Sequence, residues 1–230
     1  MSATEPSLLS AGLPPPPAPG SARYFTLLYT PTLQRCALAQ LLALADEIGA
    51  GVARALDHEV AHARLEWWRH EAAQYAAGRA RHPWLRQLPG ASGPRFDLPA
   101  LVQAAALDLA QGLQRPTGDE QLRRAVFVAA AQVLGAEPLS AAQREALGDL
   151  GTLSWQLERS APAAQGARAA LSLRALSARL GPALQPKLAP LLVWTAIAGC
   201  AKNAAPVQSL VDNIRAWSIA RRAAAGKLAR

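Results

Sequence analysis

Cysteine, lysine and aromatic residues are all scarce in this chain, and the scarcity of cysteine carries a structural consequence. The two cysteines, Cys36 and Cys200, form neither a CxxC pair nor a related metal-binding spacing, so a disulfide framework has no support. The first twenty residues lack the basic start and apolar run of a signal peptide. These features predict a reducing compartment, the cytoplasm.

Strand patterns are also missing, because no stretch alternates polar and apolar residues with an enrichment of β-branched side chains. Alanine and leucine dominate a chain that is 51% hydrophobic, which is a helical composition. A length of 230 residues suits one domain. We therefore predict an all-α, single-domain helical bundle over residues 21–230, preceded by a disordered, proline-rich lead over residues 1–20.

No uncharged run within the predicted domain is long enough for a membrane span. The run from Leu188 to Ala201 contains a proline and is flanked by Lys187 and Lys202. A transmembrane helix needs about 20 apolar residues, so this segment is expected to form a buried core helix instead.

Capping and turn residues divide the domain into eight expected helices. Four of them are expected to begin at a capping residue: Thr30, which Pro31 follows, and Asp57, Asp97 and Ser140. His82-Pro83-Trp84 is expected to be a connection, because it is rich in turn residues. The expected helices cover residues 30–52, 57–78, 97–113, 120–134, 140–159, 171–180, 191–201 and a last segment after 206.

The most unusual local string is Arg64-Leu65-Glu66-Trp67-Trp68-Arg69. Around it, apolar side chains recur every three or four residues, which places them on one stripe of a helix that should face the core. Trp67 lies about 100° away from this stripe, so the tryptophan pair covers a wide arc and predicts a cleft between helices. The stripe consists of Val60, Ala61, Leu65, Trp68, Ala72 and Tyr75.

This string belongs to a wider pattern that resembles the squalene/phytoene synthase-like family, including its degenerate branch, which contains a mitochondrial complex I assembly factor. The resemblance is strongest in the first third of the chain and covers most of residues 21–225. It rests on Arg23-Tyr24, Pro31 with Arg35, Leu41-Leu42-Ala43-Leu44, Glu47-Ile48 and the tryptophan string, with weaker similarity at Asp108-Leu109, Val133-Leu134-Gly135 and Trp217.

The resemblance implies an isoprenoid synthase type of bundle with a ligand cleft. Enzymes of this family hold prenyl diphosphates through Mg²⁺ ions bound to two aspartate-rich motifs, since hard cations take carboxylate oxygens. Aligned on Leu41-Leu42-Ala43-Leu44, the first motif falls on Gly49 and Ala53, and the second on Asp149 and Leu153. The cleft residues that the resemblance implies are Arg23, Tyr24, Arg35, Arg64, Trp67, Trp68 and Arg69.

One carboxylate out of four does not make a magnesium cluster, so the leading hypothesis is a noncatalytic protein with no catalytic residue and no cofactor. It would act as a prenyl- or lipid-binding module, or as an assembly and interaction factor with a protein partner. The first alternative is an active prenyltransferase, with Mg²⁺ held at an altered site by Asp46, Glu47, Asp149 or Asp108.

A second alternative comes from His58-Glu59-Val60-Ala61-His62, which matches the HExxH pattern of zinc hydrolases. Two histidines one turn apart can share Zn²⁺, while the glutamate activates water. Against this, His58 begins a helix and no third ligand follows at a recognised spacing. The competing interpretation is a solvated helix N-terminus.

The C-terminal segment combines an apolar stripe with cationic side chains. We expect the stripe, formed by Val207, Leu210, Val211, Ile214 and Trp217, to pack on the bundle; the alternative is a basic amphipathic helix on an anionic membrane surface. Asp212 is its only acid, against Arg215, Arg221, Arg222, Lys227 and Arg230. Nucleic acid is not an expected partner, because the basic residues behind the net charge of +8 are otherwise scattered and no nucleic-acid motif occurs.

Overall fold

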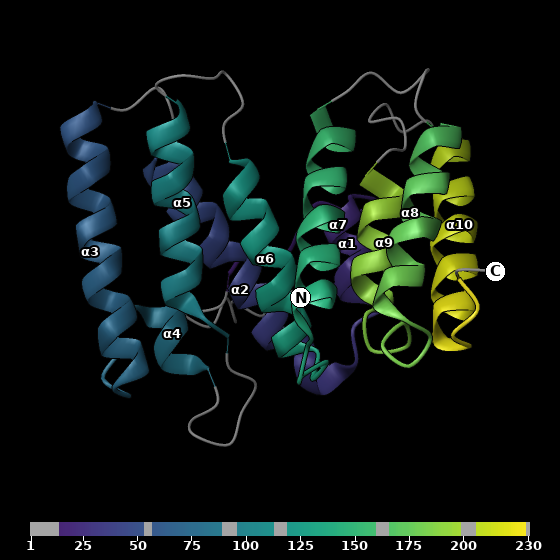
Figure 1. Ribbon diagram of the computed structural model, residues 1–230, viewed down its shortest axis with the longest axis horizontal. Helices are drawn as coiled ribbons and strands as arrows, with labels where there is room; N and C mark the ends of the chain where they lie inside the picture. The colour runs from purple at the N-terminus through teal and green to yellow at the C-terminus, as the bar shows by residue number, and fades with distance from the viewer. Residues whose placement is uncertain are drawn as a thin grey trace, which may run out of the picture.

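The protein is a bundle of α-helices, and no strand occurs among the residues that its computed structural model describes (Figure 1). These are residues 14–52, 57–88, 96–112, 119–159, 166–198 and 206–228, with backbone alone at 166–169 and 206–213. The ten described helices are α1 (Ala22–Leu28), α2 (Thr32–Gly51), α3 (His58–Ala76), α4 (Pro83–Gln87), α5 (Leu98–Gly112), α6 (Glu120–Val133), α7 (Ala141–Arg159), α8 (Gly166–Leu180), α9 (Ala189–Ala198) and α10 (Pro206–Ala224).

The helices follow one another across the long axis of the molecule. Figure 1 shows α3 at one edge, then α5, α6 and α7, with α8, α9 and α10 at the opposite edge. Each of α5, α6 and α7 packs on the next, and α2 packs on α6, so the chain forms one continuous core. The predicted all-α bundle is therefore confirmed.

The expected core helix near Leu188 is also confirmed, as α9. Its side chains are buried almost all round, because α9 packs against α1, α7, α8 and α10. A helix that is apolar on every side belongs in a core. No described helix combines the length and apolar character needed to cross a membrane.

Local capping explains several helix starts that the sequence predicts. The Asp57 carboxylate accepts a hydrogen bond from the Glu59 backbone, and Asp97 accepts one from Ala100. Ser140 and Gln143 exchange hydrogen bonds in a capping box. These side chains satisfy backbone donors that the first turn of a helix leaves without partners.

Three expectations about local structure are wrong. Thr30 does not cap α2, because its hydroxyl donates to the Thr26 carbonyl at 2.7 Å, and Pro31 precedes the helix instead. The expected connection at His82 is in fact the start of α4, where Nδ1 of His82 accepts from the Trp84 backbone. Helix α1, begun by Ser21, is absent from the expected set.

Helices α6 and α7 approach each other closely at Gly151. A methyl group there would lie 2.6 Å from the Arg123 carbonyl oxygen, so only glycine fits without moving backbone. Asp149, where the second metal motif would begin, lies on α7 two residues before this contact.

Candidate functional site

The predicted cleft residues do not form one cluster. Arg23 lies on α1, whereas Trp67, Trp68 and the two arginines beside them lie on α3 at the far edge of the molecule (Figure 1). Arg35 is exposed on α2 and donates to the Thr30 carbonyl at 3.1 Å. Tyr24 is partly exposed, with its ring edge against Phe25.

The core stripe predicted for α3 is largely confirmed, since Ala61, Leu65, Trp68 and Ala72 are buried and Tyr75 packs at the margin of the core. Val60, also assigned to the stripe, is 44% exposed because it lies near the open start of the helix. Trp68 packs inside, whereas Trp67 is 49% exposed and meets it edge to face at 4.9 Å.

The two arginines of the tryptophan string have local partners. Arg69 forms an ion pair with Glu66 one turn away. Arg64 is exposed, and its side-chain stem lies 3.7 Å from the position that a Cβ on Gly51 would take. Arg23 pairs instead with Asp46 on α2, so the described contacts do not join these arginines into one anion site.

His82 completes an aromatic group that sequence reasoning missed. Its buried ring lies 5.3 Å from Trp68 and 5.2 Å from Trp84, and its Nε2 lies 3.2 Å from a carboxylate oxygen of Glu47. Because Nδ1 accepts from the Trp84 backbone, the proton of the neutral ring sits on Nε2 and is donated to Glu47. The His82-Pro83 pair, a polar residue before a proline, is the signal that could have revealed it.

Glu71 on α3 holds the backbone just before α4 in place. It is 1% exposed and accepts hydrogen bonds from the backbones of Arg81 and His82, at 2.6 and 2.7 Å. A buried carboxylate needs such donors, and buried backbone N–H groups need an acceptor. The tryptophan region is thus a structural corner that joins α2, α3 and α4.

A polar group with contributions from five helices lies around Trp194, in the half of the bundle that contains α7 and α9. We call Arg23, Asp46, Arg123, Glu158 and Trp194 the Trp194 cluster; its members come from α1, α2, α6, α7 and α9. Trp194 is fully buried and donates from its indole nitrogen to Glu158 at 2.8 Å. The other Glu158 oxygen accepts from Arg123 at 3.0 Å.

Two guanidinium groups approach the Trp194 ring in this cluster. The central carbons of Arg23 and Arg123 lie 5.6 and 5.2 Å from the ring centroid, within the range of cation–π attraction. Arg23 also forms an ion pair with Asp46. Burial lowers the pKa of Arg23, but the carboxylates of Asp46, Glu158 and Asp119 together outweigh that effect and leave the pKa above its ordinary value.

The described positions of the two metal motifs, Gly49, Asp149 and Leu153, are all partly buried. Gly49 packs against α6, where an added Cβ would lie 3.2 Å from Leu122, so a carboxylate there would have to displace a core side chain. Leu153 packs at the margin of the core. Ala53 lies outside the described residues.

Asp149 is present but already has partners. It accepts from Arg124 at 2.9 Å and from Arg179 at 2.7 Å. Burial raises the pKa of Asp149, yet the two arginines outweigh it and hold the pKa below its ordinary value. A charged carboxylate between two guanidinium groups is well satisfied without a metal ion.

Asp108 serves the backbone of α6. It is 6% exposed and accepts from the first-turn N–H groups of Gln121 and Leu122, at 2.9 and 2.7 Å. Burial raises its pKa to about 6, against the opposing effect of these two hydrogen bonds. Within the described residues, no three or more His, Cys, Asp or Glu side chains are grouped so that they could hold a metal ion.

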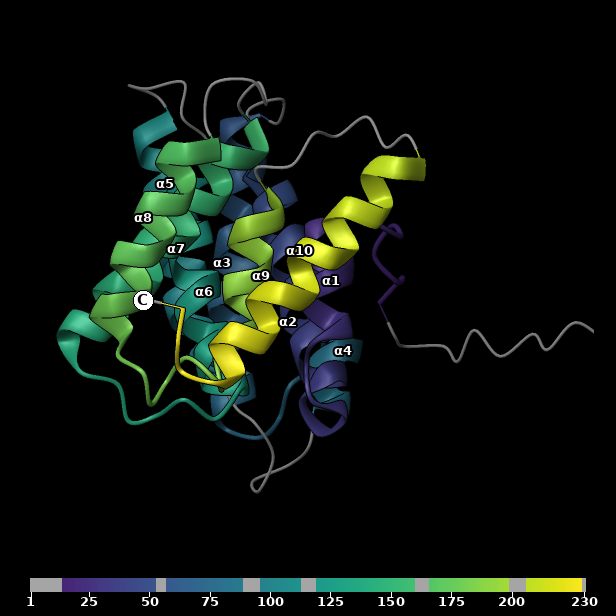
Figure 2. The same cartoon turned by 90° about the vertical axis from the view of Figure 1, so that its right-hand side faces the viewer.

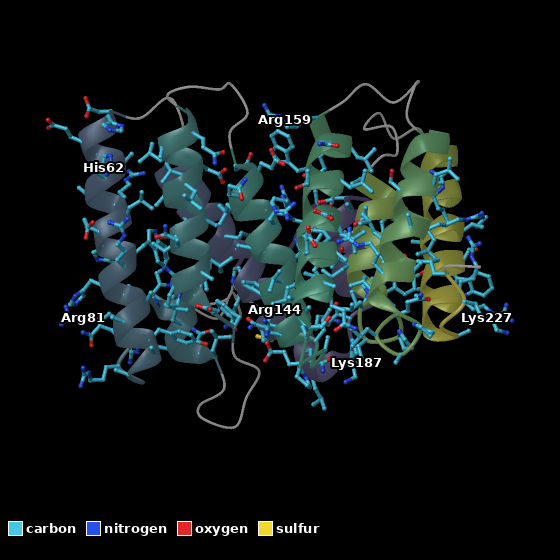
Figure 3. The ribbon with its side chains drawn as sticks, viewed as in Figure 1. His62, Arg81, Arg144, Arg159, Lys187 and Lys227 are labelled. Atoms are coloured by element: carbon cyan, nitrogen blue, oxygen red, sulfur yellow. The ribbon has the colours of Figure 1, made fainter. Side chains whose placement is uncertain are left out.

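The histidine pair of the HExxH pattern is exposed at the start of α3 (Figure 3). The two Nε2 atoms of His58 and His62 lie 3.0 Å apart, which is a hydrogen bond in which one ring donates to the other. Zinc needs both nitrogens as acceptors, so binding would have to break this bond.

Comparisons of the chain with protein-family models, with curated proteins and with solved structures found no match. The resemblance to the squalene/phytoene synthase-like family therefore rests on the residues quoted from the sequence.

Proposed function

We propose that this protein is a noncatalytic helical module of the squalene/phytoene synthase type, which binds a prenyl or lipid ligand or a protein partner without Mg²⁺-dependent chemistry. One observation carries the proposal. The four carboxylates that an altered metal site would use, Asp46, Glu47, Asp108 and Asp149, each already bind a donor of the protein itself.

Those donors come from different parts of the fold. Asp46 pairs with Arg23, Glu47 with His82, and Asp149 with Arg124 and Arg179. A Mg²⁺ ion bound by carboxylates would have to replace these partners and also draw side chains from separate helices together. This arrangement supports a binding role over the prenyltransferase alternative.

The reaction itself gives the first test. Purified protein is incubated with farnesyl or geranylgeranyl diphosphate, with Mg²⁺ and with a chelator, and release of diphosphate is measured. We expect no release above the rate without protein. Mg²⁺-dependent release with a condensed hydrocarbon product would contradict the proposal and identify a divergent synthase.

The Trp194 cluster is the part of the proposed module best suited to a diphosphate group. Guanidinium groups bind phosphate oxygens through paired hydrogen bonds, and the Asp46 side chain that holds Arg23 is 55% exposed, so an anion can compete with it. Farnesyl diphosphate binding is therefore measured by calorimetry without Mg²⁺.

In that titration, Arg23→Gln should weaken binding at least about tenfold, which corresponds to the loss of one charge-assisted pair. Arg35→Gln is the matched control and should bind as the unaltered protein does. Equal affinity of the Arg23→Gln and unaltered proteins would exclude the Trp194 cluster as the ligand site.

A further inference from the structure

Helix α10 presents apolar side chains outward, contrary to the packing expected for its stripe. Ala216, Ile219 and Ala223 face the bundle and are buried. Ile214 and Trp217 lie on the opposite side and are 59% and 53% exposed. The expectation that the stripe packs on the bundle is therefore wrong for these two residues; the side chains of Val207, Leu210 and Val211 lie outside the described set.

The reason is visible in the spacing of the buried positions. Ala216, Ile219 and Ala223 follow one another at intervals of three and four, which forms a stripe of their own. Small alanine side chains let α10 approach α9 closely, and the two helices pack together. The larger Ile214 and Trp217 are left on the outer side.

Cationic side chains surround this exposed apolar pair. Arg215, Arg221, Arg222 and Lys227 are all exposed, and the Arg221 guanidinium lies 5.2 Å from the Trp217 ring centroid. Asp212 is the only acid between Pro206 and Arg230. We call Ile214, Trp217, Arg221 and Arg222 of α10, together with Lys227 just after the end of the helix, the α10 face.

The α10 face is also placed where a flat surface can reach it. Figure 2 shows α10 as the outermost helix on its side of the molecule, lying across α9. Figure 3 shows Lys227 at this same edge, at the other end of the molecule from His62. The outer side of α10 is therefore at the surface of the molecule.

We propose that the α10 face docks the protein on an anionic membrane surface. Tryptophan and isoleucine side chains enter the headgroup region from one side of an amphipathic helix, while arginine and lysine remain beside the lipid phosphates. Each cation near an anionic leaflet adds to the attraction, and the net charge of +8 acts in the same direction. This role does not depend on a prenyl ligand.

Charge complementarity selects the lipid surface over an ordinary protein partner. Protein interfaces have apolar centres of low charge, whereas here two large apolar side chains stand among four cations. The half-exposed Trp67 at the opposite edge lacks this pattern, because α3 carries three glutamates against two arginines and pairs Arg69 with Glu66.

The test is co-sedimentation with phosphatidylcholine vesicles, with and without phosphatidylserine, using the full chain. We expect partition onto the vesicles that contain phosphatidylserine, weakened by added salt, because salt screens the attraction. Trp217→Ser should lower the partition coefficient about tenfold, and Arg221→Glu with Arg222→Glu should lower it at least as much.

Trp67→Ser is the matched control, since it removes a tryptophan of similar exposure from α3 and should leave partition unchanged. Helix content and the melting midpoint of each variant are measured alongside. Equal binding to both vesicle types, no binding by the unaltered protein, or equal losses in Trp67→Ser and Trp217→Ser would each overturn the proposal. A dimer that Trp217→Ser converts to monomer would do so as well, by showing a second copy on this face.

Discussion

Helices α3 and α10 lie at opposite edges of the bundle, and each exposes about half of one tryptophan (Figure 1). Around Trp67, α3 carries glutamates as well as arginines, and the neighbouring Trp68, His82 and Glu71 tie α3 to α2 and α4. Around Trp217 the charges are cationic. This difference shows that an exposed aromatic ring does not by itself indicate a docking surface. The charges of the neighbouring side chains determine which partner the surface can bind.

The largest expected effect is on stability, and it distinguishes the two tryptophans of α3. Trp68→Ala should lower the free energy of unfolding by about 3 to 5 kcal/mol, because it leaves a large cavity in the core. Trp67→Ala should cost less, about 1 kcal/mol, because the ring is already half exposed and loses mainly its edge contact with Trp68. Urea denaturation of both variants checks this, and equal losses would show that Trp67 is part of the corner.

The attachment of the α3 edge to the rest of the bundle depends on pH through Asp108. Helix α5 packs on both α3 and α6, and Asp108 ties it to the first turn of α6. Because the pKa of Asp108 is raised to about 6, the fold favours the protonated form. Its contribution is present below about pH 4 and is lost as the pH rises through 6.

We therefore expect the unaltered protein to lose about 2 to 3 kcal/mol of stability relative to Asp108→Asn between about pH 4 and pH 7. The asparagine keeps one acceptor oxygen but does not titrate, so any constant offset cancels. Urea unfolding of both proteins across this range measures the difference. A difference that does not change with pH would mean that the pKa of Asp108 is the same in the folded and unfolded protein.

A smaller effect tests the corner beside α3. Glu71→Ala should cost about 2 kcal/mol, because the buried N–H group of His82 and the part-buried N–H group of Arg81 both lose their acceptor. Glu66→Ala removes an exposed ion pair from the same helix and should cost less than about 1 kcal/mol. Similar melting midpoints for the two variants would argue that Glu71 does not secure the corner.

The smallest expected effect concerns metal at the start of α3. We expect no stoichiometric zinc after purification, since His58 and His62 already share a hydrogen bond and no described third ligand accompanies them. Elemental analysis measures this. Stoichiometric zinc that disappears in His62→Ala would contradict this prediction and would show that α3 carries a metal site of its own.

Much of the fold follows from local signals in the sequence. The caps at Asp57, Asp97 and Ser140 use side chains within three residues of the backbone that they bind, so they can be identified from sequence alone. Helices α1 and α4 are missed because they have 7 and 5 residues, too few to show a periodic pattern.

The polar contacts of the candidate site could not be predicted in the same way. Arg23 and Asp46 are 23 residues apart, and Asp149 and Arg179 are 30 apart. Spacing places a side chain on one face of its own helix but does not say which helix meets that face. The outward position of Trp217 has the same cause, since two stripes on α10 compete for the bundle and packing against α9 decides between them.

The central claim is that the protein's own donors hold the carboxylates. The most direct test is the melting midpoint, measured with Mg²⁺ and inorganic pyrophosphate and again with a chelator. A ligand that binds the folded state raises this midpoint by mass action. We expect no Mg²⁺-dependent shift, because Asp46 and Asp149 remain paired with arginines. A Mg²⁺-dependent rise that Asp46→Asn or Asp149→Asn abolishes would contradict the noncatalytic assignment.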